Sequence, residues 1–155
     1  MKINFAPRGI LQIDDARIVY RNFAGVASKF NREGDRNFAV IIPDREIAEE
    51  LIEAGWNVRI KPPRSEEDTE FMYLPVKIKF RNHEPNVYLL SGDDMNKLDE
   101  STVCCLDDVD IDSVDMDIRG YNWEVNGKTG RTAYLQNMRV IQRIDRFASK
   151  YSRGE

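Results

Sequence analysis

An Asn-Gly pair at Asn126 and Gly127 separates two runs of alternating residues, and this pattern constrains the fold more than any other part of the chain. Asn-Gly is the strongest short-range signal for a two-residue β-turn, because both residues tolerate the positive φ that the turn needs. A loop with an even number of residues pairs Val125 with Lys128. One face of the predicted hairpin then carries Arg119, Tyr121, Trp123, Lys128 and Tyr134.

Aromatic and cationic residues are interleaved along both predicted strands, in a chain whose formal net charge is −4. Aromatic rings stack on nucleobases and cations neutralise phosphates, so this pattern is typical of a nucleic-acid surface. The alternative is that Trp123 and the tyrosines are ordinary core or cross-strand aromatics. An odd loop, such as five residues from Asn126 to Gly130, would also split the set, because side chains alternate along a strand.

Short alternating segments elsewhere predict a mainly β protein. Strands are expected at residues 9–13 and 16–20, as a hairpin around Asp14 and Asp15, and at 37–42, 56–61, 71–80, 86–91 and 109–118, with a β-bulge at Ser113. A helix is expected between the N-cap Asp44 and Gly55, and a second short one at residues 99–106. This pattern suits an OB-fold-like, five-stranded, partly open barrel with extra β-hairpin elements. We expect residues 1–141 to form one such domain and residues 142–155 a polar tail that could form a short helix.

Two of the predicted strands, at residues 56–61 and 71–80, show a second basic face. Their apolar residues alternate with outward positions that include Arg59, Lys61, Tyr73, Lys77 and Lys79. A half-buried sheet has a polar outer face in any case, so charge alone is weak evidence. The four cations come without a carboxylate, although the chain holds 27 acidic against 23 basic residues. Pro75 predicts a bulge or an edge position.

The segment at residues 21–36 is longer than structureless connections usually are in a compact domain, which favours a functional or mobile loop. Its candidate contacts to nucleic acid are Arg21, Lys29, Phe30 and Arg32. The alternative is a solvated loop whose phenylalanines pack on the core.

Charge is segregated along the chain, with 5 basic against 15 acidic residues in 62–118 and 8 against 3 in 119–155. Local patches are therefore more informative than the net charge. No apolar run approaches the roughly 20 residues of a membrane span, and the first residues lack the apolar segment of a signal peptide, so we expect a cytoplasmic protein. Cys104 and Cys105 are adjacent and unsuited to an ordinary disulfide, and we expect both to be reduced and buried.

No pattern for catalysis or for a cofactor is present. The chain has one histidine and no spaced cysteine pair, which excludes the usual zinc and iron–sulfur patterns. The aspartates at 107, 108, 110 and 112 lack the turn glycine and the closing glutamate of a calcium loop. We therefore predict no catalytic residue, no metal site and no cofactor.

Four segments in order resemble the single-stranded DNA-binding proteins encoded in the replication regions of tailed bacteriophages and prophages. These segments are RNFAVIIPD (36–44), GWNVRIKPPR (55–64), YLPVKIKF (73–80) and VDMDIRGYNWEVNGKTGRTAYL (114–135). The resemblance implies a non-catalytic OB-fold protein that coats and protects unwound phage DNA during replication or recombination in the host bacterial cytoplasm. Phage or host replication proteins would be further partners, and the oligomeric state stays open.

The resulting site hypothesis divides the residues by role. Bases are expected to stack on Tyr73, Tyr121, Trp123 and Tyr134, and phosphates to bind Arg59, Lys61, Lys77, Lys79, Arg119 and Lys128, with the loop at 21–36 closing over the strand. A competing hypothesis is an acidic interaction module or DNA mimic, whose aspartates at 99–117 occupy the groove of a host nucleic-acid enzyme. A third is a small nuclease in which the same carboxylates hold a metal.

Overall fold

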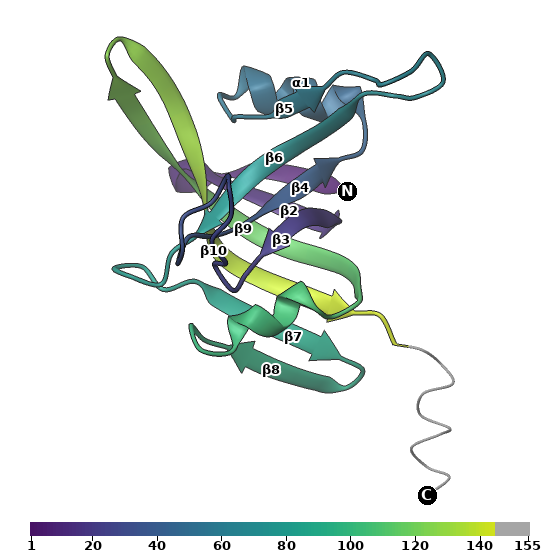
Figure 1. The fold of residues 1–155 in the computed structure, drawn as a ribbon, viewed down its shortest axis with the longest axis vertical. Coiled ribbons are helices and arrows are strands. Elements are labelled where there is room, and N and C mark those ends of the chain that lie inside the picture. Colours follow the sequence, from purple (N-terminus) through teal and green to yellow (C-terminus); the bar gives the residue numbers. More distant parts are fainter. Residues whose placement is uncertain (145–155) are drawn as a thin grey trace, which may run out of the picture.

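Strands dominate the computed structural model, which describes residues 1–144 (Figure 1). Within these residues the strands are β1 (Lys2–Ala6), β2 (Ile10–Ala16), β3 (Ile18–Asn22), β4 (Arg36–Ile42), β5 (Arg59–Lys61), β6 (Phe71–Ile78), β7 (Asn86–Ser91), β8 (Asp94–Leu98), β9 (Ile111–Val125) and β10 (Lys128–Gln142). The helices are α1 (Arg45–Glu53) and the short 3-10 helices η1 (Pro7–Gly9) and η2 (Val103–Asp107). The helix considered for the C-terminal tail lies outside the described residues.

The strand order β1-β2-β9-β10-β6-β4-β3 almost closes on itself. Only Arg17 separates β2 from β3, so these are two parts of one strand that pairs first with β9 and then with β4. Within this circuit β6 and β10 run parallel, and the other neighbours are antiparallel. This is the arrangement of a partly open OB barrel, with β1, β5 and the β7–β8 hairpin added to it. The predicted fold class is confirmed.

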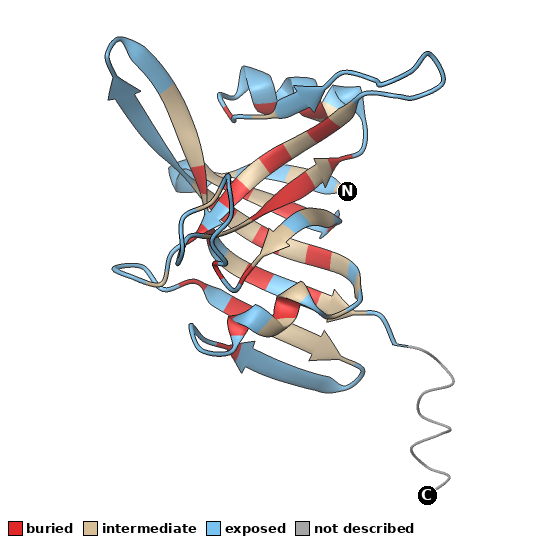
Figure 2. Ribbon diagram, viewed as in Figure 1, coloured by how far each residue is buried: buried red, intermediate tan, exposed pale blue. Residues whose placement is uncertain are grey.

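The core follows the alternation of the sequence, as Figure 2 shows along β6 and β9. Val114, Met116 and Ile118 of β9 point inward and are buried, whereas the intervening aspartates point outward. Phe23 and Phe38 stack in the interior with ring centroids 5.4 Å apart. Because one face of each long strand is buried, a shift of one residue in register would expose the whole apolar set.

The predicted hairpin around Asp14 and Asp15 is wrong. The chain continues in one direction from β2 into β3, and the hairpin partner of β2 is β1, which it joins through η1. Asp15 has a φ of 53°, and its backbone N–H donates to Oδ1 of Asp115 at 2.8 Å. The β2–β9 register shifts here. Two consecutive polar residues, of which Asp15 has a positive φ, therefore form a bulge in this strand rather than a turn.

The helix after Asp44 is confirmed. Oδ1 of Asp44 accepts a hydrogen bond from the backbone N–H of Ile47 at 2.9 Å, and Gly55 takes a φ of 95° just after the helix. The second predicted helix is present only as η2, and β8 has too little hydrophobic alternation to be predicted. Cys104 is exposed, contrary to expectation, while Cys105 is half-buried and burial raises the pKa of its thiol.

Pro75 lies neither at a bulge nor at an edge of the sheet. Its pairing with Ala39 of β4 is continuous with the neighbouring pairs. On the other side of β6, β5 pairs with residues 71–73 and β10 with residues 76–77, so Pro75 falls in the gap between them. The missing N–H of proline is tolerated where no ladder partner stands opposite. The predicted bulge at Ser113 is confirmed to within one residue, because Asp112 is skipped in the pairing of β9 with β10.

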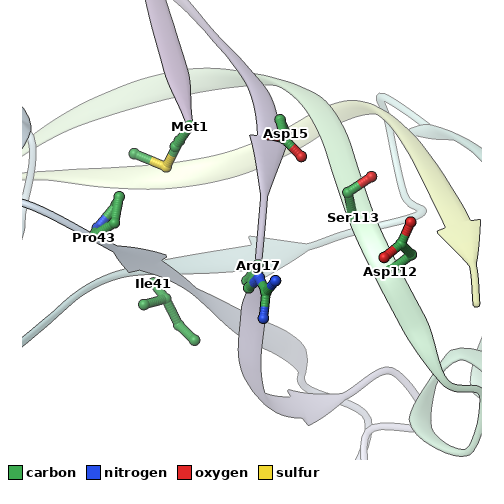
Figure 3. A pocket seen from close by; sticks show the side chains of 7 residues that line it. All are labelled: Met1, Asp15, Arg17, Ile41, Pro43, Asp112 and Ser113. Atoms are coloured by element: carbon green, nitrogen blue, oxygen red, sulfur yellow. The ribbon is translucent and has the colours of Figure 1, made fainter.

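The barrel is open near Arg17, between β2, which pairs with β9, and β3, which pairs with β4. A hollow of about 250 Å³ lies there, and Figure 3 shows Arg17 with Asp15 and Asp112 and the apolar Met1, Ile41 and Pro43 around it. One cation and two carboxylates make this lining electrically mixed. Within residues 1–144, no helix has the length and apolar composition needed to cross a membrane.

Candidate nucleic-acid interface

The β9–β10 hairpin decides which of the predicted side chains share a face. Asn126 and Gly127 have φ values of 52° and 79°, and Val125 pairs with Lys128, so the predicted even turn is confirmed. Trp123 is 39% exposed, so it is not a core aromatic, although its ring does pack on the cross-strand residue Gly130. The outer part of the β9–β10 hairpin projects from the body in Figure 1, and we call residues 119–134, from the base of this projection to its turn and back, the arm.

Trp123 lies across the partner strand of the arm. Its cross-strand neighbour is Gly130, and a Cβ at Gly130 would meet Cζ2 of the indole at 2.4 Å and Cε2 at 2.7 Å. Only glycine leaves room for the ring in this position, because real Cβ atoms do not approach so closely. Tyr121, two residues earlier on the same face, is 57% exposed. The arm therefore presents two accessible rings on one side.

Tyr134 connects the arm to β6. Its cross-strand neighbours are Arg119 in β9 and Lys77 in β6. Cζ of Arg119 lies 5.0 Å and Nζ of Lys79 lies 5.4 Å from the centroid of the Tyr134 ring. Cation–π attraction holds both cations beside this half-buried ring. Positive charge is thus concentrated where the arm leaves the barrel.

A second aromatic group lies further along β6. The centroids of Tyr73 and Phe71 are 5.7 Å apart, and Tyr20 of β3 packs edge-on at 5.5 Å from Tyr73 and 6.2 Å from Phe71. Nζ of Lys61 donates to the hydroxyl of Tyr20 at 2.8 Å and lies 4.9 Å from the centroid of its ring. This hydrogen bond raises the pKa of Lys61 above its ordinary value, so the side chain is cationic at neutral pH.

These strands form one surface, which we call the basic aromatic face. Its rings are Tyr20, Phe71, Tyr73, Tyr121, Trp123 and Tyr134, and its cations are Arg59, Lys61, Lys77, Lys79, Arg119 and Lys128. The same positions of the arm, β5 and β6 hold no carboxylate, and the nearest on β9 is Asp117, one outward position before Arg119. All ion pairs among residues 1–144 involve Arg36 or Arg45. The six cations are therefore free of ion pairs with the described carboxylates.

The loop at residues 23–35 lies beside this face and is folded by its own side chains. Nδ2 of Asn31 donates to the carbonyl oxygens of Val26, Arg32 and Asp35 at 2.9 to 3.0 Å. Oδ1 of Asn31 accepts from Nδ2 of Asn37 at 2.9 Å. Asn37 is in turn the cross-strand neighbour of Lys77. The loop is thus attached to the edge of the basic aromatic face.

Phe30 is 91% exposed at this loop, with Nζ of Lys29 5.7 Å from the centroid of its ring. Arg32 is also exposed. The alternative, in which the phenylalanines of the segment pack on the core, holds for Phe23 and is wrong for Phe30. Burial of a large ring is the default, so an exposed one on a folded loop indicates a contact surface.

Arg21 has intramolecular partners. Its Nη1 donates to the carbonyl oxygens of Leu106 and Val109 at 2.8 and 2.7 Å, which holds η2 and the segment after it against β3. We therefore leave Arg21 out of the proposed interface. Tyr20 and Phe71, by contrast, belong to the basic aromatic face although the sequence did not predict them as contacts to DNA. Phe71 is readable from the alternation of β6, but Tyr20 reaches the face through a φ of 54° that no periodicity predicts.

Arg131 supports the arm from the side opposite the basic aromatic face. Its Nε donates to Oδ1 of Asn122 at 2.8 Å, and its Nη1 donates to the carbonyl oxygen of Ala54, just after α1, at 2.7 Å. Cζ of Arg131 lies 5.1 Å from the Trp56 ring. A Cβ at Gly120 would meet Cδ of Arg131 at 2.7 Å, so this glycine makes room for the side chain. Arg131 is thus a basic residue of the hairpin that stabilises the arm and does not belong to the basic aromatic face.

The fold and the face define an OB-fold protein with exposed rings, and with cations that form no ion pair within residues 1–144, along β5, β6 and the arm. Residues 2–153 match the family of putative phage ssDNA-binding domains. The chain belongs to this family. A comparison with curated proteins gave no match.

Solved structures of the single-stranded DNA-binding protein from bacteriophage Enc34 share the fold. A C-terminally truncated form has a TM-score of 0.59 at 11% identity, covering 91% of this chain and 90% of that chain. The complex of that protein with ssDNA has a TM-score of 0.57 at 14% identity, with coverages of 92% and 90%. A third structure has a TM-score of 0.56 at 14% identity, with coverages of 97% and 99%.

Proposed function

We propose that this protein binds single-stranded DNA on the basic aromatic face and so coats and protects unwound phage DNA during replication or recombination. The observation that carries the proposal is the interleaving of accessible rings with cations that have no acidic partner among the described residues. Such a surface binds the two features common to every single strand, base planes and phosphates. Family membership supports the same function.

The proposed roles follow from position. Trp123, Tyr121, Tyr134 and Tyr73 offer planes to bases, each stack being worth about 1 to 3 kcal/mol. The six cations of the face neutralise phosphates, and the loop with Lys29, Phe30 and Arg32 contributes from the side. Because neither stacking nor phosphate binding reads base edges, the affinity is expected to depend little on sequence and strongly on salt.

The proposal extends to the location, the DNA-binding unit and the partners of the protein. We infer a non-catalytic protein of the host bacterial cytoplasm, with residues 1–141 as the DNA-binding unit and phage or host replication proteins as further partners. Several aspartates at residues 99–117 accept intramolecular hydrogen bonds, including Asp99, Asp107, Asp115 and Asp117. Carboxylates engaged in this way favour a structural role for the stretch over a mimic of DNA phosphates.

The test is a titration with oligothymidine at low and high salt. Trp56 is buried, so quenching of tryptophan fluorescence in the wild type reports on Trp123. Anisotropy of a labelled oligothymidine gives the affinity of the variants. Trp123→Ala should weaken binding by about 5- to 150-fold, the equivalent of one lost stack.

Charge is tested in the same assay. Lys77→Ala should reduce the slope of log K against log salt by about 0.7, as expected for one phosphate contact to a single strand. Lys97→Ala is the matched control, because Lys97 is an exposed lysine on β8, outside the basic aromatic face. Wild-type affinity and salt slope in both Trp123→Ala and Lys77→Ala would refute the proposed site.

A further inference from the structure

Asp107 binds the start of the loop that carries Phe30. Its Oδ1 accepts a hydrogen bond from the backbone N–H of Phe23 at 2.7 Å, and its Oδ2 accepts one from the N–H of Ala24 at 3.0 Å. Asp107 is the last residue of η2, 83 or more positions away along the chain. A carboxylate that accepts two adjacent amide protons fixes the direction of the backbone, because hydrogen bonds to a charged acceptor are the strong ones.

Two arginines tie the same two segments together. Nε of Arg36, at the far end of the loop, donates to the carbonyl oxygen of Phe23 at 2.9 Å. The guanidinium of Arg36 also donates to the carbonyl oxygen of Glu100 at 3.2 Å and pairs with its carboxylate at 3.5 Å. Arg21, just before the loop, donates to the carbonyl oxygens of Leu106 and Val109. Both ends of the loop are therefore held by the acidic stretch at residues 99–110.

We propose that Asp107 is a positioning residue for single-stranded DNA, acting through the loop at residues 23–35. The inference rests on the proposed function and adds a role for the acidic stretch, which holds the loop in its binding conformation before DNA arrives. A loop that is already ordered loses less conformational entropy on binding than one that the ligand must order. Asp107 itself does not touch the DNA.

The proposal predicts a change in affinity opposite to that expected from charge. Removing a carboxylate from a DNA-binding protein reduces its repulsion of phosphates and should strengthen binding. Asp107→Asn removes the same charge but turns an amide NH₂ toward a backbone N–H, so that one acceptor is lost and two donors face each other. The loop is then held less firmly, and binding becomes weaker.

Asp108→Asn is the matched control. Asp108 is the adjacent residue, its side chain is exposed, and it makes no side-chain hydrogen bond or ion pair within residues 1–144. Anisotropy with labelled oligothymidine should show Asp108→Asn binding as tightly as the wild type or slightly tighter. Asp107→Asn should bind about 3- to 30-fold more weakly, within the range of coupling between neighbouring residues.

A double-mutant cycle with Phe30→Ala separates this role from a general loss of structure. If Asp107 acts through the loop, Asp107→Asn should weaken binding by a smaller factor in the Phe30→Ala background than in the wild type, because only the contacts of Lys29 and Arg32 then remain to be lost. The same loss in both backgrounds, or equal affinities of Asp107→Asn and Asp108→Asn, overturns the proposal. Hydrogen exchange of the Phe23 and Ala24 amides should speed up in Asp107→Asn alone, and unchanged exchange likewise counts against it.

A second variant applies if Asp107→Asn does not fold, as judged by thermal unfolding. Asp107→Glu keeps the charge but places the oxygens one methylene further out, so it should weaken binding in the wild-type background and do so by a smaller factor in Phe30→Ala. Failure of this inference is distinct from failure of the proposed function. A wild-type protein that does not bind oligothymidine refutes both, whereas tight binding that needs Trp123 but is indifferent to Phe30 and Asp107 refutes only the positioning role.

Discussion

Gly130→Ala provides a sharp test of the geometry of the arm, because it adds one methyl group beneath the Trp123 ring. The φ of Gly130 is not in the left-handed region, so alanine can adopt the backbone conformation without strain. In an open strand position, Gly→Ala would stabilise a protein by about 0.4 to 1 kcal/mol by restricting the unfolded chain. Here the new Cβ would lie 2.4 Å from Cζ2 of Trp123, about 1 Å inside an ordinary contact.

The size of the effect depends on how the ring responds. An added methyl group in a packed site costs about 1 to 3 kcal/mol, and the partly exposed Trp123 can swing outward, so we expect the free energy of unfolding to fall by about 1 kcal/mol. The displaced ring no longer lies flat across the partner strand. Loss of a large part of one base stack makes the free energy of binding less favourable by about 1 to 2 kcal/mol, which corresponds to about a 5- to 30-fold weaker affinity.

Anisotropy titration with oligothymidine measures the affinity, and urea unfolding measures the stability. The same substitution in a Trp123→Ala background is the control, because the steric conflict is then absent and Gly130→Ala should be neutral or stabilising. The sign of the effect on stability should therefore reverse between the two backgrounds. Equal effects in both, or wild-type DNA affinity for Gly130→Ala alone, would refute the assignment of Trp123 as a platform formed over Gly130.

Two further predictions concern the residues that support the face. Arg131→Lys keeps the charge but cannot reproduce the hydrogen bonds to Asn122 and Ala54 together with the contact to Trp56. Urea unfolding should therefore show the free energy of unfolding reduced by about 1 to 2 kcal/mol. Arg139→Lys, at an exposed arginine, is the control and should change it by less than about 0.5 kcal/mol. Tyr20→Phe removes the hydroxyl that raises the pKa of Lys61, so an NMR titration should show this pKa moving down toward its ordinary 10.5. Because the native pKa is raised, the contribution to stability is complete below pH 10.5 and disappears as the pH rises through the native value, and an unmoved Lys61 titration would contradict the assignment.

Local signals predicted those parts of the site that depend on a single strand or turn. The Asn-Gly turn set the parity of the hairpin, which placed Lys128 and Tyr134 on the same face as Trp123. Alternation in β6 likewise placed Tyr73 and Lys77 outward. These predictions succeed because the two-residue period of a strand and the positive φ of a tight turn are properties of neighbouring residues.

The predictions that were wrong concern residues whose hydrogen-bond partners lie far away in the sequence. Asp14 and Asp15 look like a turn, yet a hydrogen bond from the Asp15 amide to Asp115, 100 residues away in the sequence, makes the segment a bulge. Arg21 looks like a free cation, yet distant carbonyl groups hold its guanidinium. In both cases the partner comes from another part of the chain, and the local sequence contains no information about it.

Sequence by itself determined that this protein is mainly β, that its hairpin turns at Asn126 and Gly127, and which side of each strand is apolar. It did so because periodicity and turn chemistry act over a few residues. Only the tertiary structure decided that the arm and β6 meet at Tyr134, that Tyr20 completes the second aromatic group, and that Asp107 holds the loop bearing Phe30. Those contacts join residues far apart in the chain, and barrel closure, rather than any local preference, brings them together.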